Sequence, residues 1–197
     1  MMKDVTGLYR EFGDSRLPPG QRETDGFPVL SKSGTPAVDP DEWSFEVFGA
    51  VETGLTLSLE EFRGLPSETQ TQDFHCVTGW SKFDCQFSGV PFPRLIERAQ
   101  ATGEAVHVMF HSADGYTTDL ALADCLREEV LFAYGYDGEA LPADHGGPLR
   151  VVTPHKYAYK GAKWVTGVEL LTEPARGYWE QRGYSQTANP WAEQRYG

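Results

Sequence analysis

The sequence predicts an α+β domain in which mixed strands are joined by short helices. Residues Trp43 to Val51 alternate apolar and polar side chains, as a half-buried strand does. Ser58 and Glu61 have the spacing of a capping box at the start of a helix. Asp-Gly pairs at 114–115 and 137–138 separate apolar runs and are typical of hairpin turns. Many strands with isolated short helices on one side indicate the α+β class.

Two short helices are predicted in the first half of the chain. The first follows Ser58 and contains the apolar residues Phe62 and Leu65. The second covers Pro93 to Gln100, because proline favours the first turn of a helix, and we expect it to end at Gly103.

The second half of the chain predicts strands joined by tight turns. We expect a strand over Ala105 to Ser112, a hairpin into Tyr116 to Leu122, and a helical turn over Leu122 to Leu126. Core strands are expected over Pro148 to Pro154 and over Lys163 to Leu171. The last stretch, from Gly177, carries aromatic residues without periodicity.

Residues 1–42 differ in composition from the rest of the chain. They are rich in proline, glycine and charge but contain Phe27, Val29 and Leu30. We therefore expect an extended N-terminal arm laid over one domain formed by residues 43–197.

Composition limits the function classes. A chain of 197 residues with 40% apolar content can bury one sizeable core. Its formal net charge of -12 repels polyphosphate, so we expect no nucleic acid partner, and any anionic ligand needs a local basic pocket. No apolar run has the length of a signal or membrane segment, and we expect a cytoplasmic protein without membrane insertion.

The cysteines point to one candidate metal ligand. Cys76, Cys85 and Cys125 form no C-x-x-C pair, so neither a disulfide framework nor a zinc ribbon fits. The stretch HCVTGWS places Cys76 after a strand and before a glycine-containing turn. A thiolate there suits molybdenum, copper, iron-sulfur or zinc, whereas a buried structural cysteine is the more common origin of such a pattern taken alone.

A basic cluster stands out in the acidic chain between Asp144 and Val165. Guanidinium and ammonium groups are what a phosphate-bearing cofactor needs, and the glycines permit close backbone approach. A solvated basic edge remains the alternative. The cluster consists of His145, Arg150, His155, Lys156, Lys160 and Lys163.

Together these stretches resemble the molybdenum domain of sulfite oxidase and its bacterial relatives. HCVTGWS, GVPFPRLIE, HSADGYTTDL, DHGGPLRVVTP, KGAKWV and GYWEQRGY occur in the family's order. The resemblance covers most of the chain from Trp43 onward, and it implies the family's molybdopterin-binding fold.

The resemblance also implies a cofactor of molybdenum and molybdopterin. It makes Cys76 the single protein ligand of the metal and Tyr184 a catalytic residue that donates a hydrogen bond to an oxo group or to substrate. The implied cofactor-binding residues are Phe27, His75, Thr78, His145, Arg150, Lys160 and Lys163. The tryptophans at 80, 164 and 179 are candidates for a substrate funnel or for the core.

Departures from the family bear on the substrate. Sulfite oxidases carry arginines near the segments that here read TDGFPVL and CVTGWSKF, where Lys82 is the only nearby cation. A dianion would lose its charge-assisted hydrogen bonds, so reduction of S- or N-oxides is favoured over sulfite oxidation. Either reaction is a two-electron oxygen-atom transfer on a small molecule. Without a haem domain, a separate electron-transfer partner is expected.

Two other functions stay open. One is a cofactor-free relative that acts as a binding module, although a scaffold has no need for Cys76, Arg150, Lys163 and Tyr184 together. A zinc hydrolase would combine Cys76 with His75, His145 or His155, but the chain has no HExxH motif.

Overall fold

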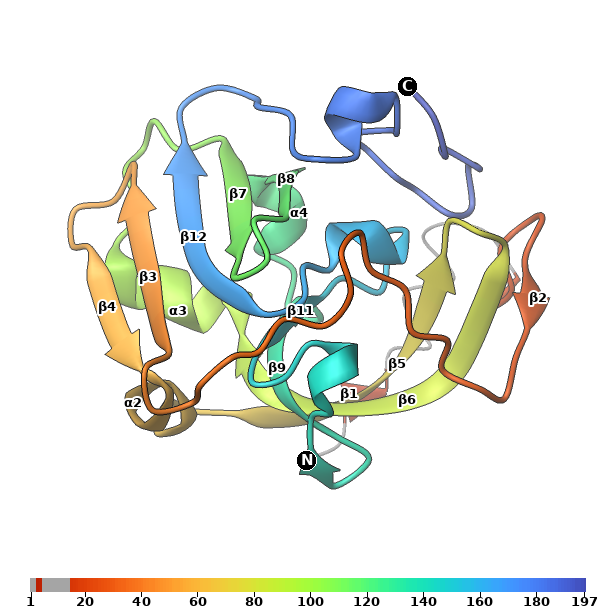
Figure 1. Ribbon diagram of the computed structural model, residues 1–197. Helices are drawn as coiled ribbons and strands as arrows, with labels where there is room; N and C mark the ends of the chain where they lie inside the picture. The colour runs from red at the N-terminus through yellow and green to blue at the C-terminus, as the bar shows by residue number, and fades with distance from the viewer. Residues whose placement is uncertain (1–2, 5–14) are drawn as a thin grey trace.

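The computed structural model describes residues 3–4 and 15–197, which form two β-sheets (Figure 1). The five-stranded sheet has the order β4 (Leu55–Ser58), β3 (Ser44–Gly49), β12 (Val165–Leu171), β7 (His107–Ser112) and β8 (Thr117–Ala121). The other sheet has the order β1 (Lys3–Asp4), β5 (Glu68–Cys76), β6 (Trp80–Pro91), β9 (Leu131–Tyr136) and β10 (Glu139–Ala140). In that sheet β11 (Arg150–Val152) also pairs with β9, and β2 (Arg22–Glu23) pairs with β6.

The helices are short, as predicted. They are α2 (Leu59–Arg63), α3 (Phe92–Ala99) and α4 (Leu122–Cys125), with the 3-10 turns η2 (Ala143–His145), η3 (Ala158–Lys160) and η4 (Glu180–Arg182). The capping box is present, since the Ser58 hydroxyl accepts from the Glu61 N–H and the Glu61 carboxylate accepts from the Ser58 N–H. The helix predicted over Pro93 to Gln100 is confirmed as α3 within one residue at each end, but Gln100 in the left-handed cap position (φ 54°), and not Gly103, ends it.

Most predicted strands are confirmed, but one long strand was missed. The stretches expected at Trp43–Val51, Ala105–Ser112 and the Asp114–Gly115 hairpin correspond to β3, β7 and β8. Strand β6 runs from Trp80 to Pro91 without a clean alternation of apolar and polar residues. Its backbone departs from regular pairing at Asp84 (φ 55°) and near Gly89, which breaks the two-residue period that a sequence pattern relies on.

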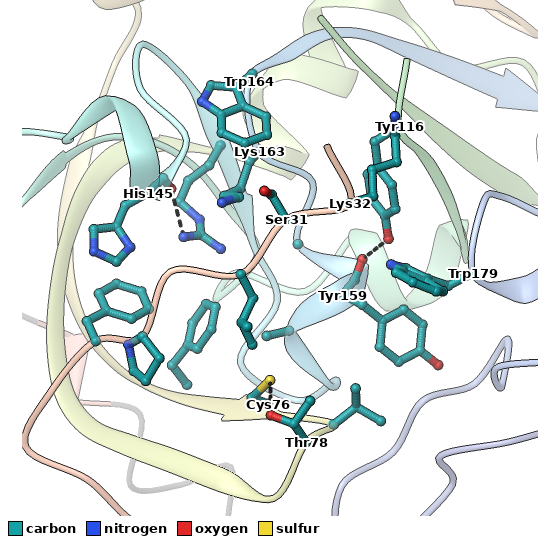
Figure 2. A pocket seen from close by; sticks show the side chains of 18 of the residues that line it. Ser31, Lys32, Cys76, Thr78, Tyr116, His145, Tyr159, Lys163, Trp164 and Trp179 are labelled. Atoms are coloured by element: carbon teal, nitrogen blue, oxygen red, sulfur yellow. Dashed lines mark hydrogen bonds between the residues drawn. The ribbon is translucent and has the colours of Figure 1, made fainter. Parts of the chain in front are cut away.

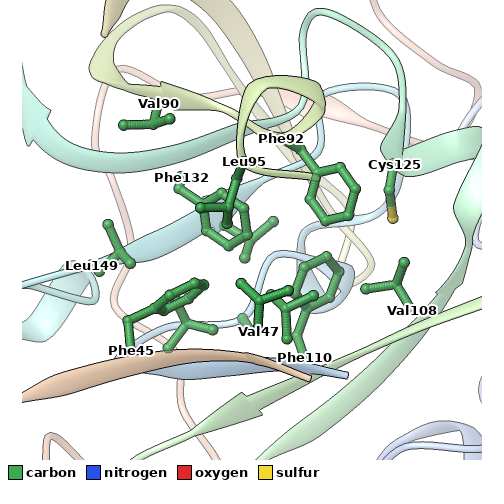
Figure 3. Close-up of a cluster of buried hydrophobic side chains, with 14 of the residues drawn as sticks. Phe45, Val47, Val90, Phe92, Leu95, Val108, Phe110, Cys125, Phe132 and Leu149 are labelled. Carbon is green, nitrogen blue, oxygen red and sulfur yellow. The ribbon is translucent and has the colours of Figure 1, made fainter. Parts of the chain in front are cut away.

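The main core is aromatic and lies between the sheets (Figure 3). Phe132 of β9 is at its centre, with ring centroids 5.3 Å from Phe45 and 5.7 Å from Phe92. Phe62 and Phe110 complete the group at 6.0 and 6.2 Å from Phe132. Close packing of this kind makes a rigid support for residues at the sheet edges.

The arm leads from β2, which pairs with β6, across the domain to β3 of the other sheet (Figure 1). Strand β2 pairs in parallel with the start of β6, and Phe27 then packs against Phe74 at 5.0 Å. Farther along, the Lys32 ammonium donates to the Asp114 carbonyl at 2.7 Å. Residues 1–2 and 5–14 of the predicted arm lie outside the described residues, and the boundary between residues 42 and 43 stays a prediction. In the part of the chain that is described, no helix has the length and apolar character needed to span a membrane.

Candidate active site

A pocket of about 300 Å³ lies where the arm crosses the ends of β5 and β11. Figure 2 shows Cys76 and Thr78 at one end, His145, Lys163 and Trp164 at another, and Tyr116, Tyr159 and Trp179 along a third side. The predicted site residues that line the pocket are Phe27, Cys76, Thr78, His145, Arg150, Lys163 and Tyr184. Segments far apart in the chain are therefore brought together in one cavity.

Cys76 is the last residue of β5 and begins a tight turn. Gly79 closes the turn in the left-handed region (φ 98°), and its N–H donates to the Cys76 carbonyl at 3.0 Å. The thiol is 6% exposed, and its sulfur lies 3.1 Å from the Thr78 hydroxyl. Burial raises the pKa of Cys76, while the Thr78 hydrogen bonds act in the opposite direction. A metal ion supplies the positive charge that a thiolate needs in such a place.

Arg150 is a buried cation without a carboxylate partner among the described residues. Its side chain is 2% exposed, and its guanidinium donates to the His145 carbonyl at 2.9 Å. The guanidinium also lies 4.9 Å from the centre of the Phe74 ring and 5.9 Å from that of Phe27. Burial lowers the pKa of Arg150 to about 10. A guanidinium that is shielded from water beside a cavity, with no carboxylate to balance its charge, favours an anionic ligand.

Lys163 adds a second cation to the same wall. Its ammonium donates to the Asp144 carbonyl at 2.8 Å and lies 4.4 Å from the Trp164 ring centre. Burial and the nearby Arg150 lower the pKa of Lys163 to about 8. Gly146 lies between the two cations with φ 112°, and a Cβ there would be 3.0 Å from the Cβ atoms of both. Glycine at this position therefore lets the chain pack closely against the first carbons of both basic side chains.

His145 and Phe27 form a flat, uncharged wall. Their ring centroids are 4.1 Å apart and their planes differ by 19°. Burial is the main reason that the pKa of His145 is lowered, so the imidazole is neutral near pH 7. A stacked pair of this kind suits the face of a heterocycle.

Tyr184 belongs to the aromatic side of the pocket. Its ring lies 5.1 Å from Trp179 and 5.4 Å from Tyr159. Burial raises the pKa of Tyr184, and the neighbouring Tyr196 and Cys76 add to this, so the phenol stays protonated and can donate a hydrogen bond. The tryptophans at 80, 164 and 179 all line the pocket, as considered from the sequence.

Two predicted cofactor-binding residues do not line the pocket. His75 is followed by Cys76 on the same strand, and successive side chains of a strand point to opposite faces. Its Nδ1 is 2.8 Å from the Ser81 hydroxyl, and burial lowers its pKa to about 4. Lys160 is fully buried and binds Asp119 and Glu180. Lys82, the cation noted near Cys76, donates to the Asp25 carbonyl at the surface.

The sequence analysis missed Lys32, which the arm brings to the pocket. Its ammonium lies 3.6 Å from a carboxylate oxygen of Asp114, a residue 82 positions later in the chain. The Asp114 carboxylate also accepts from Ser33 at 3.0 Å. No local sequence pattern predicts the pair of Lys32 and Asp114, because only the course of the arm brings these two residues together.

Cys76 is the candidate protein ligand that the pocket offers to a metal ion. Among residues 3–4 and 15–197, no group of three or more His, Cys, Asp or Glu side chains is placed to hold a metal ion. The zinc-hydrolase alternative thus finds no ligand set in that part of the chain. A single buried thiol beside an anion-binding wall fits a metal whose other ligands belong to an anionic cofactor.

Comparisons with known proteins agree with this arrangement. The family described as oxidoreductase molybdopterin binding domain matches residues 32–179. An uncharacterized oxidoreductase of Bacillus subtilis, YuiH, is 41% identical over 182 residues, which is 92% of each chain. The protein-methionine-sulfoxide reductase catalytic subunit MsrP of Campylobacter jejuni is 29% identical over 75% of this chain and 57% of its own.

A solved structure shows the same fold. The sulfane dehydrogenase SoxCD of Paracoccus pantotrophus matches with a TM-score of 0.65 and 21% identity, over 72% of this chain and 41% of that chain. The predicted α+β fold with mixed strands and short helices is thereby confirmed.

Proposed function

The chain belongs to the oxidoreductase molybdopterin-binding domain family, and on that premise we propose that it reduces a small uncharged S- or N-oxide by two-electron oxygen-atom transfer. The family's cofactor is molybdenum held by molybdopterin, which supplies the redox chemistry when bound. The observation that carries the proposal is the division of the pocket into a cationic wall and a separate aromatic wall without an unpaired cation.

The cationic wall fits the anionic part of the cofactor. Arg150 and Lys163 would hold its phosphate, since Arg150 is buried and Lys163 half-buried beside the cavity, and neither has a carboxylate partner among the described residues. The stacked Phe27 and His145 would hold the pterin rings. Cys76 would ligate the metal, with the Thr78 hydroxyl at 3.1 Å orienting its sulfur.

The aromatic wall suits a neutral substrate. Lys32 is the cation there, and Asp114 neutralises it at 3.6 Å. A sulfite dianion would therefore find no free guanidinium on this side, whereas a sulfoxide needs only one donor for its oxygen. Four relatives are named as protein-methionine-sulfoxide reductase catalytic subunits, which supports an S-oxide.

Tyr184 would supply that donor. Its raised pKa keeps the phenol protonated, and a neutral donor can bind an oxide oxygen without adding charge. Trp179 and Tyr159 pack against its ring and hold the phenol at the pocket wall.

The electrons would come from a separate redox protein. The MsrP relatives are named as catalytic subunits, and the chain spans just over half the length of the one from Campylobacter jejuni. An electron-transfer partner is therefore part of the proposal, as the sequence predicted.

The test compares substrates in protein from a molybdenum-replete host. Reduction of dimethyl sulfoxide, methionine sulfoxide and trimethylamine N-oxide by reduced benzyl viologen is measured beside oxidation of sulfite by ferricyanide. We expect oxide reduction to exceed sulfite oxidation by at least about tenfold, because the pocket lacks paired guanidinium groups for a dianion. A preference for sulfite would contradict the proposal.

A matched pair of cysteine variants separates metal binding from general damage. Cys76→Ala should lose both molybdenum and turnover, while Cys125→Ala, which removes a thiol buried in the main core, should keep both. If Cys76→Ala retained metal and turnover, the assignment of the metal ligand would fail. Protein without molybdenum, from a host that loads a control molybdoenzyme, would favour the binding-module alternative.

A further inference from the structure

The turn that carries Cys76 is held from outside by the N-terminal arm. Within the turn, the Gly79 N–H donates to the Cys76 carbonyl at 3.0 Å. The side-chain amide of Gln21 donates to the same carbonyl at 3.2 Å. The Gly79 carbonyl accepts from the Arg22 N–H at 3.0 Å. The arm therefore fixes the first and last residues of the turn.

Arg195, far along the chain, holds the middle of the same turn. Its guanidinium donates a hydrogen bond to the carbonyl of Val77, the residue that follows Cys76. The guanidinium also lies 5.1 Å from the centre of the Tyr157 ring, a fully buried side chain. The Val77 carbonyl belongs to the planar peptide group that leads into Thr78. The hydrogen bond from Arg195 therefore fixes the orientation of that peptide group.

Thr78 connects that peptide group to the candidate metal ligand. Its hydroxyl lies 3.1 Å from the Cys76 sulfur, and both side chains line the pocket (Figure 2). Arg195 is not one of the lining residues. The guanidinium therefore acts on the sulfur through the turn, as an outer partner of a metal ligand does, and not by touching a bound molecule.

The backbone around Arg195 holds this side chain in place. The Arg195 carbonyl accepts from the Ser185 N–H at 3.1 Å, and its N–H donates to the Glu193 carbonyl at 2.8 Å. Tyr184 and Tyr196 form an antiparallel bridge in the same segment, with ring centroids 5.2 Å apart. One short segment thus carries both the pocket residue Tyr184 and the guanidinium that supports the turn.

The guanidinium also brings a positive charge close to the sulfur. Burial raises the pKa of Cys76, whereas the charge of Arg195 acts in the opposite direction. Arg195 is half-buried, so water screens this charge only in part. Because a metal site becomes more negative when it takes up electrons, a nearby cation favours its reduced state over its oxidised state.

We propose that Arg195 is a positioning residue that fixes the turn from Cys76 to Gly79 and raises the reduction potential of a metal bound at Cys76. The inference rests on the proposed function, in which Cys76 is the metal ligand. Loss of the guanidinium should loosen the turn and disfavour the reduced state of the metal. Since Arg195 does not line the pocket, substrate binding should stay unchanged.

The first test needs neither metal nor turnover. In ¹⁵N-labelled protein without cofactor, exchange of the Gly79 amide hydrogen with solvent is followed by nuclear magnetic resonance. Arg195→Gln should speed this exchange by about tenfold, as expected for loss of a charged hydrogen bond that holds the turn closed. The amide of Phe132 in the main core is the internal reference and should not change. Unchanged exchange at Gly79, or equal acceleration at Phe132, would overturn the proposal.

The second test measures the potential of the loaded protein. A redox titration of bound molybdenum is followed by electron paramagnetic resonance, beside the kinetics of sulfoxide reduction. Arg195→Gln should shift the potential downward and lower kcat several-fold at unchanged KM. Arg195→Lys keeps the charge and should retain a potential close to that of the wild type. An unshifted potential in Arg195→Gln, or the same shift in Arg195→Lys, would contradict the role assigned to the charge.

The matched control is Arg182→Gln. Arg182 is exposed and also donates to a backbone carbonyl, that of Tyr178 at 2.7 Å, but it makes no listed contact with the turn. We expect wild-type exchange at Gly79, potential and kcat. If this variant matched Arg195→Gln, the effect would not be specific to Arg195 and the proposal would fail. If the wild-type protein bound no molybdenum, the proposed function would fail by itself, and exchange at Gly79 would still decide whether Arg195 holds the turn.

Discussion

Arg150 and Lys160 are both buried cations of one basic stretch, yet their surroundings are opposite. Arg150 is 2% exposed, faces the pocket and has no carboxylate partner among the described residues. Lys160 is 0% exposed and is held by Asp119 and Glu180. The difference shows that pairing with a carboxylate, and not burial or charge alone, decides whether a buried cation is available to a ligand.

The local backbone explains why they diverge. Arg150 begins β11, whose pairing with Ala133 of β9 directs its side chain into the smaller aromatic group around Phe74 and Phe87. Lys160 ends η3, and the turn at Gly161 directs it toward β8 and η4 instead. A Cβ at Gly161 would be 2.6 Å from the Val151 carbonyl, so this turn requires glycine.

The largest effect is expected when the compensated cation is removed. Lys160→Met leaves two buried carboxylates without their ammonium, which should lower the free energy of unfolding by about 3–5 kcal/mol. Urea unfolding of the protein without cofactor measures this. Lys163→Met, in the same basic stretch but without a carboxylate partner, is the control and should lose far less. If both variants lost the same free energy of unfolding, the proposed difference between the paired Lys160 and the unpaired Lys163 would be contradicted.

Removing the uncompensated cation should separate stability from cofactor binding. Arg150→Met takes away a buried charge that no carboxylate among the described residues pairs, so the free energy of unfolding should stay within about 1 kcal/mol or rise. Bound molybdenum and pterin should fall by about tenfold or more, as expected for loss of a charge-assisted hydrogen bond. A strongly destabilised variant would show that the guanidinium stabilises the fold.

Arg150→Lys sharpens the same comparison. The variant keeps the positive charge but loses the planar guanidinium group with its several N–H donors. Its molybdenum and pterin content should therefore lie between the contents of the wild type and of Arg150→Met. Wild-type content would mean that charge alone is sufficient.

The smallest effect concerns pH. The pKa of Lys163 is lowered to about 8, so its ammonium is charged below that pH and loses its charge above it. Sulfate, which remains a dianion throughout, should therefore bind the cofactor-free pocket a few-fold more weakly as pH rises from 7 to 9. Calorimetric titration measures this, and Lys163→Arg should bind sulfate independently of pH over that range.

Much of the fold and site was predictable because its signals are local. The capping box at Ser58, the two Asp-Gly turns and the placement of Cys76 before a glycine turn each depend on a few adjacent residues. The family resemblance rests on the same short stretches, and the family match at residues 32–179 confirms it.

The tertiary structure alone decided how distant residues meet. The stacking of Phe27 on His145 joins the arm to η2, and the partners of Lys160 come from positions 41 and 20 residues away. His75 and Cys76 are neighbours in sequence, yet only Cys76 faces the pocket, because the strand alternates its faces and the position of the arm selects one of them. Local residue patterns determine secondary structure, whereas burial and charge compensation depend on packing between distant segments, and these determined which cations of this protein face the pocket without a carboxylate partner among the described residues.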